Sequence, residues 1–405
     1  MDNERLIKNC EIKLKEKFEL ADEIAYFNQV KVINAFNKNR ISVMHFNGTT
    51  GYGYGDIGRD TLSQLYADVF CAENGIVSPH LLSGTHSLTV ALFGILRPDD
   101  RVLCITGTPY DTLKGVISGK GEGTLEDYNI RFEYCNLKDG DFDYKEIENR
   151  LNGEYKMIYI QRSRGYELRD ALSCAQIGEV CKFLRNKGFE GCIFVDNCYG
   201  EFVEKTEPIE VGADVIVGSL IKNAGGGLAP TGGYICGKNE YINLIGKRFT
   251  APSIGLEVGS YASGYQYFYQ GLFYAPHTVA QAVKVSLLIG QAMDELGFKN
   301  YPSMEKVPHD ITRAIEFDSE EKMVNFIREV QYASPVDGYV TCEAWDMPGY
   351  SDKIIMAAGT FVSGASIELS ADGPVKPPYI AYFQGGLTYE HGKYALTKIL
   401  NSLNK

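Results

Sequence analysis

The chain is poor in tryptophan, with one among 405 residues, and it has no long uninterrupted apolar run. A membrane-spanning helix needs about 18 or more consecutive apolar residues, so no membrane span is expected. The N-terminal stretch MDNERLIKNCEIKLKEKFEL is charged throughout and contains no apolar centre. A secretory signal peptide is therefore not expected either.

Spacings typical of metal sites and redox dithiols are absent as well. None of the ten cysteines forms a CxxC pair, and the six histidines, at positions 45, 80, 86, 277, 309 and 391, show no HxxxH spacing. Zinc sites and disulfide oxidoreductases usually need such pairs, so we expect no metal centre. Several cysteines lie in apolar runs, where cysteine behaves as a small hydrophobic residue. We expect all ten to be reduced, which favours a cytoplasmic location.

An excess of basic residues is also missing, because the net charge is −12. Binding to nucleic acid or to anionic lipid needs a basic surface, so neither partner is expected. Hydrophobic residues make up 44% of the chain and charged residues 23%, as in soluble globular proteins. A chain of this length usually exceeds what one core can hold, so two lobes are expected.

The order of apolar segments predicts an α/β fold. Helix-like segments separate strand-like runs, which read RVLCIT (101–106), MIYIQ (157–161), GCIFVD (191–196) and DVIVGS (214–219). Strands that alternate with helices favour a mostly parallel sheet with helices on both faces. We expect a large domain over residues 61–275, and a smaller α+β domain over residues 276–405.

Residues 1–60 are expected to form an N-terminal helix and a loop. Within residues 6–38, one apolar stripe at helical spacing is formed by Leu20, Ile24, Phe27, Val30 and Ile33. Residues 47–60 contain five glycines. Ordering so many glycines is entropically costly, so this loop should carry function or pack against something.

The C-terminal lobe is expected to begin with a long amphipathic helix over residues 279–298. Strands are expected over residues 337–343, 353–361 and 378–383. A final helix is expected over residues 391–403. Strands in short succession with helices to one side are typical of an α+β lobe.

Lys222 stands at the mouth of the strand-like run 214–219 and precedes three consecutive glycines, 225–227. Burial lowers the pKa of an amine, and a neutral amine can form a Schiff base with a carbonyl group. The alternative is an ordinary surface lysine in a glycine-rich loop. The residues at the ends of the other strand-like and helix-like runs decide between a Schiff-base lysine and a surface lysine.

Two further strand ends carry side chains that suit a ring-shaped ligand. The run 191–196 ends at Asp196, a buried carboxylate that needs a partner such as a protonated pyridine nitrogen. Tyr110, beyond the run 101–106, could stack on a ring. The alternatives are a turn-capping aspartate and a tyrosine at the rim of the sheet.

Other ends suit anionic groups. Ser83, Gly84 and Thr85 open a helix, whose free backbone N–H groups can bind phosphate, and Ser219 is another hydroxyl candidate. Arg162 and Arg164 follow the run 157–161 and suit an acidic ligand. An ordinary helix cap and a pair of solvated arginines are the alternatives.

Together these groups describe one ligand. An amine can form an imine, a carboxylate can pair with a ring nitrogen, an aromatic side chain can stack, and a helix start can hold phosphate. Ligands of open parallel sheets bind at the carboxyl ends of the strands, where these residues stand. The cofactor expected from this combination is pyridoxal 5′-phosphate (PLP).

The sequence resembles the aluminium-resistance / methionine γ-lyase-like family, which is related to the cystathionine-type enzymes of cysteine and methionine metabolism. Six blocks carry the resemblance, which covers nearly the whole chain: GYGYGD (51–56), SGTH (83–86), QRSRGY (161–166), VDNCYGEF (195–202), SLIKNAGGG (219–227) and GASIELSADGP (364–374). The resemblance implies fold type I of the PLP enzymes, with the large domain built on a sheet of the seven-stranded type. It also implies a homodimer or homotetramer whose active sites are shared between subunits.

The resemblance also implies roles for single residues. Lys222 would be the Schiff-base lysine and Asp196 the partner of the ring nitrogen, while Tyr110 would stack on the ring. Gly84, Thr85 and Ser219 would hold phosphate.

The glycine-rich loop would carry Tyr52, Tyr54 and Arg59 into the site of the neighbouring subunit. The sequence departs from cystathionine-type enzymes there, since their Tyr-x-Arg is here Tyr52-Gly53-Tyr54. Ser219-Leu220-Ile221-Lys222 also lacks one of the hydroxyls that those enzymes carry before the lysine.

No arginine for the substrate carboxylate stands near the C-terminus, because the chain has none after Arg328. Lys376 is the nearest cation after the block 364–374, and Arg162 or Arg164 could take its place.

The expected function is that of a PLP-dependent carbon–sulfur lyase acting on a methionine-, cystathionine- or cysteine-type amino acid. Lys222 would act as the base at Cα, and Lys222 or Tyr54 could move a second proton. The tyrosine-rich run 261–274 could form the wall for a thiol leaving group. Aldol cleavage, transamination, and a PLP-binding stress-response protein without turnover remain as alternatives.

Overall fold

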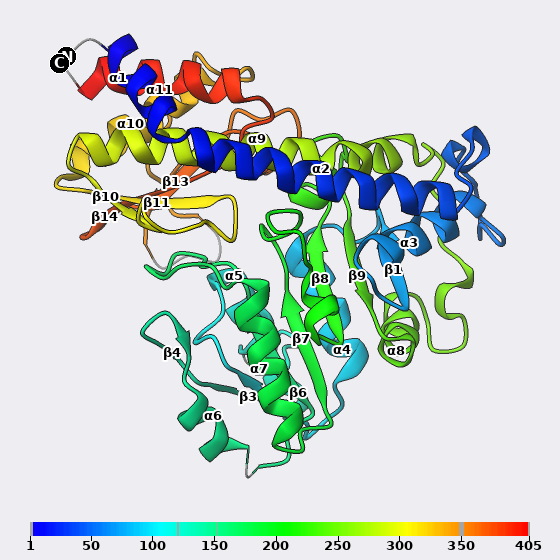
Figure 1. Cartoon of the computed structure of the whole chain (residues 1–405). Helices are drawn as coiled ribbons and strands as arrows, with labels where there is room; N and C mark the ends of the chain where they lie inside the picture. Colours follow the sequence, from blue (N-terminus) through cyan, green and yellow to red (C-terminus); the bar gives the residue numbers. More distant parts are fainter. Residues whose placement is uncertain (1–2, 120, 152, 348–351, 404–405) are drawn as a thin grey trace.

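The computed structural model describes residues 3–119, 121–151, 153–347 and 352–403. Within that part of the chain, seven strands form one sheet in the order β1-β9-β8-β7-β6-β2-β3 (Figure 1). Their bounds are β1 Asn74–Ser78, β2 Arg101–Cys104, β3 Arg131–Tyr134, β6 Met157–Gln161, β7 Cys192–Asp196, β8 Val215–Ser219 and β9 Gly233–Gly237. Strand β9 runs antiparallel to both of its neighbours, and the other pairs are parallel. The expected mostly parallel sheet is confirmed.

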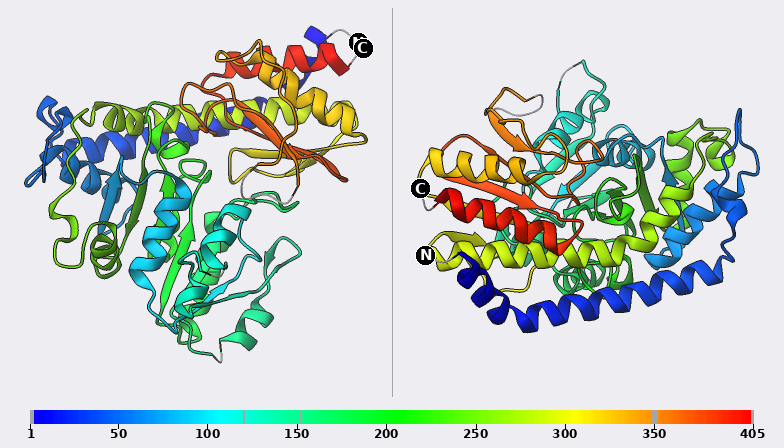
Figure 2. Two further views of the ribbon diagram at one scale, coloured as in Figure 1. Left: turned by 180° about the vertical axis from the view of Figure 1, so that it is seen from behind. Right: turned by 90° about the horizontal axis from the view of Figure 1, so that it is seen from above.

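Helices cover both faces of this sheet, as expected. In the central strand β7, Cys192 and Phe194 point to one core, while Ile193 and Val195 point to the other. Continuous apolar runs are typical of strands buried on both faces. The helix α7 (Cys174–Asn186) lies in front of the sheet in Figure 1, and α4 (Gly84–Ile95) lies in front when the molecule is seen from behind in Figure 2.

The remaining elements of the first half are short or peripheral. They are α3 Ile57–Val69, α5 Asp111–Ile117, α6 Tyr144–Arg150, α8 Asn239–Phe249, and the hairpin of β4 Leu137–Lys138 with β5 Asp141–Phe142. Helices α4 and α8 pack together on one face.

A second, antiparallel sheet has the order β10-β11-β14-β13-β12. Its strands are β10 Lys299–Tyr301, β11 Thr312–Phe317, β12 Ile354–Ala357, β13 Ser370–Pro374 and β14 Tyr379–Gln384, and it is accompanied by α10 Glu320–Ala333 and α11 Tyr389–Leu403. The expected α+β lobe is therefore present. The strand expected over residues 337–343 is wrong, because this stretch is a turn, closed by a hydrogen bond from the Val340 N–H to the Asp337 carbonyl, followed by irregular chain.

Two long helices lie side by side across both lobes of the molecule (Figure 1). The short helix α1 (Asn3–Lys13) is followed directly by the long helix α2 (Lys15–Lys38). Helix α2 lies along α9 (Gln266–Glu295) over most of its length (Figures 1 and 2). Helix α9 begins well before the expected residue 279, so residues 266–274 of the tyrosine-rich run form its first turns. It is the one described helix long and apolar enough to cross a membrane, and 72% of its apolar window is buried in this fold. The division into domains at residues 60 and 275 stays a prediction.

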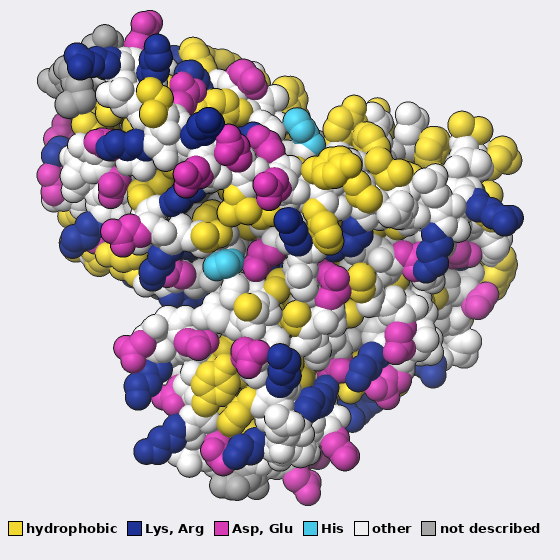
Figure 3. Space-filling model, in the orientation of Figure 1, with side chains coloured by type: hydrophobic (Ala, Val, Ile, Leu, Met, Phe, Trp, Pro, Cys, Tyr) yellow, Lys and Arg dark blue, Asp and Glu magenta, His cyan; other side chains and the backbone are white. Residues whose placement is uncertain are grey.

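The apolar stripe of α2 does not face the core of its own chain. Its buried positions are Ala21, Asn28, Val32 and Ala35, which allow a close approach, whereas Phe27 is 47% exposed and Ile33 is 41% exposed. Figure 3 shows hydrophobic side chains gathered along this helix. Periodicity predicts an apolar face but not which surface covers it.

Candidate active site

A cavity of about 530 Å³ lies between the first sheet and the second. Sites for small molecules typically enclose about 300–1,000 Å³. From the first half of the chain its lining includes Ser83, Gly84, Thr85, Tyr110, Gln161, Arg164, Asp196, Tyr199, Ser219 and Lys222. From the second half it includes Thr312, Met356, Ser370, Asp372, Tyr382 and Gln384. The carboxyl ends of β6, β7 and β8 thus meet at one cavity.

Lys222 projects into this cavity just after β8. Its Nζ atom lies 4.1 Å from the centre of the Tyr199 ring, which places the ammonium over an aromatic face. Burial lowers the pKa of the Lys222 amine, but the acidic side chains around it, chiefly Cys198 and Tyr199, raise that pKa well above the usual lysine value. Burial thus acts in the expected direction, but the neighbouring side chains outweigh it.

Asp196 ends β7 and is 4% exposed. Its Oδ1 atom accepts the Cys198 N–H at 3.2 Å, and the Tyr159 hydroxyl lies 3.5 Å from its Oδ2 atom. Burial raises the pKa of the Asp196 carboxyl, and Lys222 lowers it in part. A buried carboxylate with so few donors is stabilised by any cation that enters the cavity beside it.

The start of α4 forms the anionic-ligand end of the cavity. Ser83 is the helix cap, since its hydroxyl accepts the His86 N–H at 3.0 Å. Ser219 Oγ is buried and has no hydrogen-bond partner among the described residues. A Cβ atom placed on Gly84 would lie 3.5 Å from the Cβ atom of Ser219, so the two positions face each other. An unpaired hydroxyl opposite a helix N-terminus fits a phosphate group.

Tyr110 caps α5 and reaches the same end of the cavity. Its hydroxyl lies 3.1 Å from Thr85 Oγ1, and its N–H donates to Gln161 Oε1 at 3.0 Å. Burial and the charge of Asp196 raise the pKa of the Tyr110 phenol, so it stays protonated at neutral pH. Tyr110, Thr85 and Asp196 are brought together, as the sequence suggested.

Arg164 is 1% exposed, and it lines the cavity. Its Nη1 atom donates to the Tyr301 carbonyl at 2.5 Å, while Nε and Nη2 have no partner within the described chain. A buried guanidinium with two free donors is built to receive a carboxylate. Arg164 therefore fits the carboxylate group of an amino acid.

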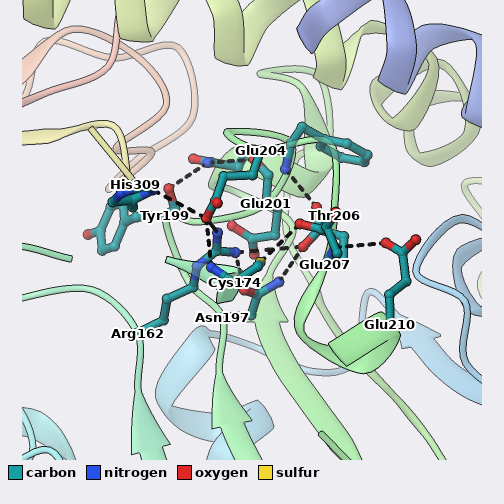
Figure 4. A network of polar contacts seen from close by, with 12 residues as sticks. Arg162, Cys174, Asn197, Tyr199, Glu201, Glu204, Thr206, Glu207, Glu210 and His309 are labelled. Atoms are coloured by element: carbon teal, nitrogen blue, oxygen red, sulfur yellow. Dashed lines mark hydrogen bonds and ion pairs between the residues drawn. The ribbon is translucent and has the colours of Figure 1, made fainter. Parts of the chain in front are cut away.

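Arg162 is not a cavity residue. Its guanidinium is fully buried in another network, where it donates to Asn197 Oδ1 at 2.8 Å and to Glu204 at 2.7 Å (Figure 4). Burial raises the pKa of Glu204, but His309 and Arg162 hold it down at about 2. The prediction that Arg162 binds substrate is wrong, because it lies outside the cavity lining and is neutralised by Glu204 and Glu207.

Lys376 does not reach the cavity either. It pairs with Asp352 at the surface, where its side chain is 52% exposed. The prediction of Lys376 as a substrate residue is therefore wrong in this chain.

The glycine-rich loop points away from its own cavity. Tyr52 and Tyr54 are 70% and 67% exposed, and their rings contact each other. Arg59 donates to the Gly53 carbonyl at 3.1 Å and pairs with Asp60 at 2.8 Å. Their expected place in a neighbouring subunit stays a prediction.

The tyrosine-rich run has a different place from the one expected. Tyr265 donates to Asp56 Oδ2 at 2.8 Å, and Tyr269 donates to the Gly58 carbonyl at 2.7 Å. These tyrosines anchor the glycine-rich loop instead of forming a wall of the cavity, so that expectation is wrong.

Sequence reasoning missed several cavity residues. Tyr199, beneath Lys222, belongs to the block VDNCYGEF, and Asp372 belongs to GASIELSADGP. Both residues could have been found from the sequence, because both blocks carry the family resemblance. Among the described residues, no group of three or more His, Cys, Asp or Glu side chains could hold a metal ion.

The fold and the cavity define a class of protein. A buried lysine, a buried carboxylate and a helix start with a free hydroxyl, all at the carboxyl edge of a mostly parallel sheet, fit PLP. The crystal structure of the pyridoxal-5′-phosphate-dependent protein YhfS from Escherichia coli has the same fold, with a TM-score of 0.63 at 15% identity over 95% of this chain and 97% of that chain. The fold is fold type I of the PLP enzymes.

The chain belongs to the methionine gamma-lyase family, whose model matches residues 3–404. It is 48% identical over 386 residues to the uncharacterized protein YnbB of Bacillus subtilis, which covers 94% of this chain and 92% of YnbB. It is also similar to a structure described as a carbon-sulfur lyase involved in aluminum resistance, from Clostridium novyi NT. That structure has a TM-score of 0.95 at 43% identity and covers 99% of this chain and 96% of its own.

Proposed function

We propose that this chain is a PLP-dependent carbon–sulfur lyase that acts on a sulfur amino acid by β- or γ-elimination. One observation carries the proposal: Lys222, Asp196, the unpaired Ser219 hydroxyl and the half-paired Arg164 guanidinium line the same cavity. These groups match a carbonyl, a ring nitrogen, a phosphate and a carboxylate.

Each residue has a stated task in this proposal. Ser219, Thr85 and the backbone at Gly84 bind phosphate, and Asp196 holds the proton on the ring nitrogen. PLP, when bound, supplies an electron sink. Lys222 would hold PLP through its amine, and the same amine would move the proton at the substrate Cα. Burial of Lys222 and Asp196 excludes water from these charges.

The cavity favours elimination over transamination. A transaminase binds two acids in turn, which usually calls for a second arginine. Among the described residues that line the cavity, Arg164 is the one arginine, since Arg162 is held by Glu204 and Glu207. One carboxylate clamp is sufficient for elimination.

Release of ammonia and a 2-oxo acid tests this function directly. The holoprotein is incubated with L-methionine, L-cystathionine and L-cysteine without any added keto acid. We expect equal amounts of ammonia and 2-oxo acid from at least one of them. If 2-oxo acid forms only when an acceptor keto acid is present, with one new amino acid for each, the chain is a transaminase.

We also propose a homodimer or homotetramer with shared active sites, in the cytoplasm. The exposed side of α2 supports the assembly, since Tyr26, Phe27 and Val30 line a shallow hollow of about 700 Å³ there. Apolar patches of this kind commonly mark protein interfaces. The ten free cysteines are consistent with a reducing compartment.

Hybrid oligomers test the shared site. Tyr54→Phe and Lys222→Ala are each expected to be inactive alone, and mixing them should restore part of the activity. Absence of rescue after verified subunit exchange would mean that each site is built from one chain.

A further inference from the structure

The second sheet presents a polar wall to the cavity. In the register of the strands, Thr312 of β11 lies opposite Gln384 of β14, which lies opposite Ser370 of β13. Two residues further along β13, Asp372 lies opposite Tyr382 of β14. Side chains two residues apart on a strand share a face, so these five line one surface, and all five border the cavity.

The opposite face of the same strands is apolar. Ala371 on β13 and Ala381 and Phe383 on β14 are buried in the main core, on the side where α10 packs. The polar residues therefore stand on the cavity side alone. A wall of hydroxyl, amide and carboxyl groups is not needed to fill a core, so it is suited to a polar ligand.

Asp372 is the charged member of this wall, and its hydrogen bonding is incomplete. The side chain is 8% exposed, and its Oδ2 atom accepts from Gln384 Nε2 at 3.2 Å. Its Oδ1 atom has no partner in the part of the chain that the structure describes.

Burial raises the pKa of Asp372 to about 6, and hydrogen bonds from Tyr166 and Gln384 lower it in part. No basic side chain of the described residues contributes to that balance. At neutral pH Asp372 is therefore a buried carboxylate without an ion-pair partner among the described residues, and a ligand cation would stabilise it.

Asp372, Arg164 and Tyr382 line the same cavity. Burial raises the pKa of the Tyr382 phenol, while Arg164 lowers it and Asp372 raises it, so both charges act at that hydroxyl. The cavity thus offers one free guanidinium edge and one free carboxylate oxygen. An amino acid whose α-carboxylate binds Arg164 can direct the far end of its side chain to Asp372.

We propose that Asp372, with Gln384, Ser370 and Thr312, binds an ammonium group at the far end of the substrate side chain. The substrate class is then a thioether amino acid with a second amino group beyond the sulfur. This inference rests on the proposed carbon–sulfur lyase function and narrows it, because a plain alkyl thioether leaves the Asp372 carboxylate unpaired.

Two thioethers of equal length test the proposal. S-(2-Aminoethyl)-L-cysteine ends in an ammonium group, and S-propyl-L-cysteine ends in a methyl group. Binding to the holoprotein at pH 7.5 or so is measured by calorimetry, and turnover is measured by release of ammonia. We expect the ammonium compound to bind about 10- to 100-fold more tightly, since hydrogen bonds between charged groups are stronger than neutral ones.

Variants assign that preference to Asp372. Asp372→Asn keeps an acceptor for Gln384 and should reduce the ratio of the two affinities to about one. Glu316→Gln is the matched control, because Glu316 lies on the same sheet outside the cavity lining and pairs with Lys299 and Tyr301. In the double variant Asp372→Asn/Gln384→Glu, a carboxylate returns on the same face two rows away, and part of the preference should return.

The outcomes separate the two proposals. Equal affinity for both thioethers in the native protein, or an unchanged ratio in Asp372→Asn, overturns the ammonium site. Release of ammonia from neither thioether, nor from the three amino acids above, overturns the lyase function, and the calorimetric ratio still decides the ammonium site.

Discussion

A single methyl group at Gly84 tests the phosphate end of the site. Gly84 begins α4 and has no left-handed backbone angle that would oppose a side chain. A Cβ atom there would lie 3.5 Å from Ser219 Cβ and 3.6 Å from Cys198 Sγ, which are ordinary contacts. The fold should therefore accept Gly84→Ala, while the methyl group fills the space that the proposal gives to phosphate.

Gly84→Ala should stabilise the cofactor-free fold and at the same time weaken the binding of PLP. Replacing glycine by alanine at a compatible site stabilises a protein by about 0.4–1 kcal/mol. Losing one hydrogen bond to a charged group costs about 1.5–3 kcal/mol. Since about 1.4 kcal/mol corresponds to a tenfold change, the affinity for PLP should fall roughly 10- to 100-fold.

The assay compares the cofactor-free and cofactor-loaded chains. Thermal unfolding of the cofactor-free protein measures the change in its stability. Titration with PLP, followed by the visible absorption of the cofactor, gives the dissociation constant. Gly115→Ala in α5 is the control, because a Cβ atom at Gly115 would meet nothing within 4 Å. Unchanged PLP affinity in Gly84→Ala would refute the assignment of α4 as the phosphate site, and so would an equal loss in both variants.

Three further predictions follow from the charges of the site. Asp196→Asn should lower turnover by orders of magnitude with little change in the thermal midpoint; activity within about threefold of the native value would make Asp196 a mere turn cap. Arg162→Met should lower the free energy of unfolding, measured by urea denaturation, by about 3–5 kcal/mol, because it leaves Glu207 buried and unpaired. Arg164→Lys should mainly raise KM, because lysine lacks the two-pronged geometry of the guanidinium. The reverse pattern would mean that the two arginines are assigned wrongly. The preference for S-(2-aminoethyl)-L-cysteine should be present above pH 6 and be lost as the pH falls through about 6, because burial raises the pKa of Asp372 to about 6 and the carboxylate takes up a proton there. Burial raises the pKa of the neighbouring Tyr382 phenol, which therefore stays protonated over this range, so a preference unchanged down to pH 4.5 or so would contradict the assignment to Asp372.

Much of the site follows from the sequence because it depends on strand ends. Asp196, Ser219 and Lys222 follow runs whose apolar character predicts buried parallel strands, and such strands bring their carboxyl ends together. The helix start at Gly84 follows from the cap Ser83 and the apolar run after it. These are local signals with one geometric consequence.

Other residues depend on contacts that no local pattern contains. Arg162 and Arg164 are two residues apart, and they differ because Glu204 and Glu207 fold back onto only one of them. Strand β13 reads SADGP, with little intrinsic strand preference, and it forms because β12 and β14 pair with it on both sides. The place of Asp372 in the cavity wall therefore could not be predicted without the register of β13 and β14.

The location of the covalent bond between the cofactor and the chain tests the central claim most directly. The PLP-loaded protein is reduced with borohydride, digested and mapped by mass spectrometry, with Lys222→Ala treated in parallel. We predict a pyridoxyl group on Lys222 in the native protein and no labelled lysine in the variant. Label on another lysine, or label that persists in Lys222→Ala, would contradict the account.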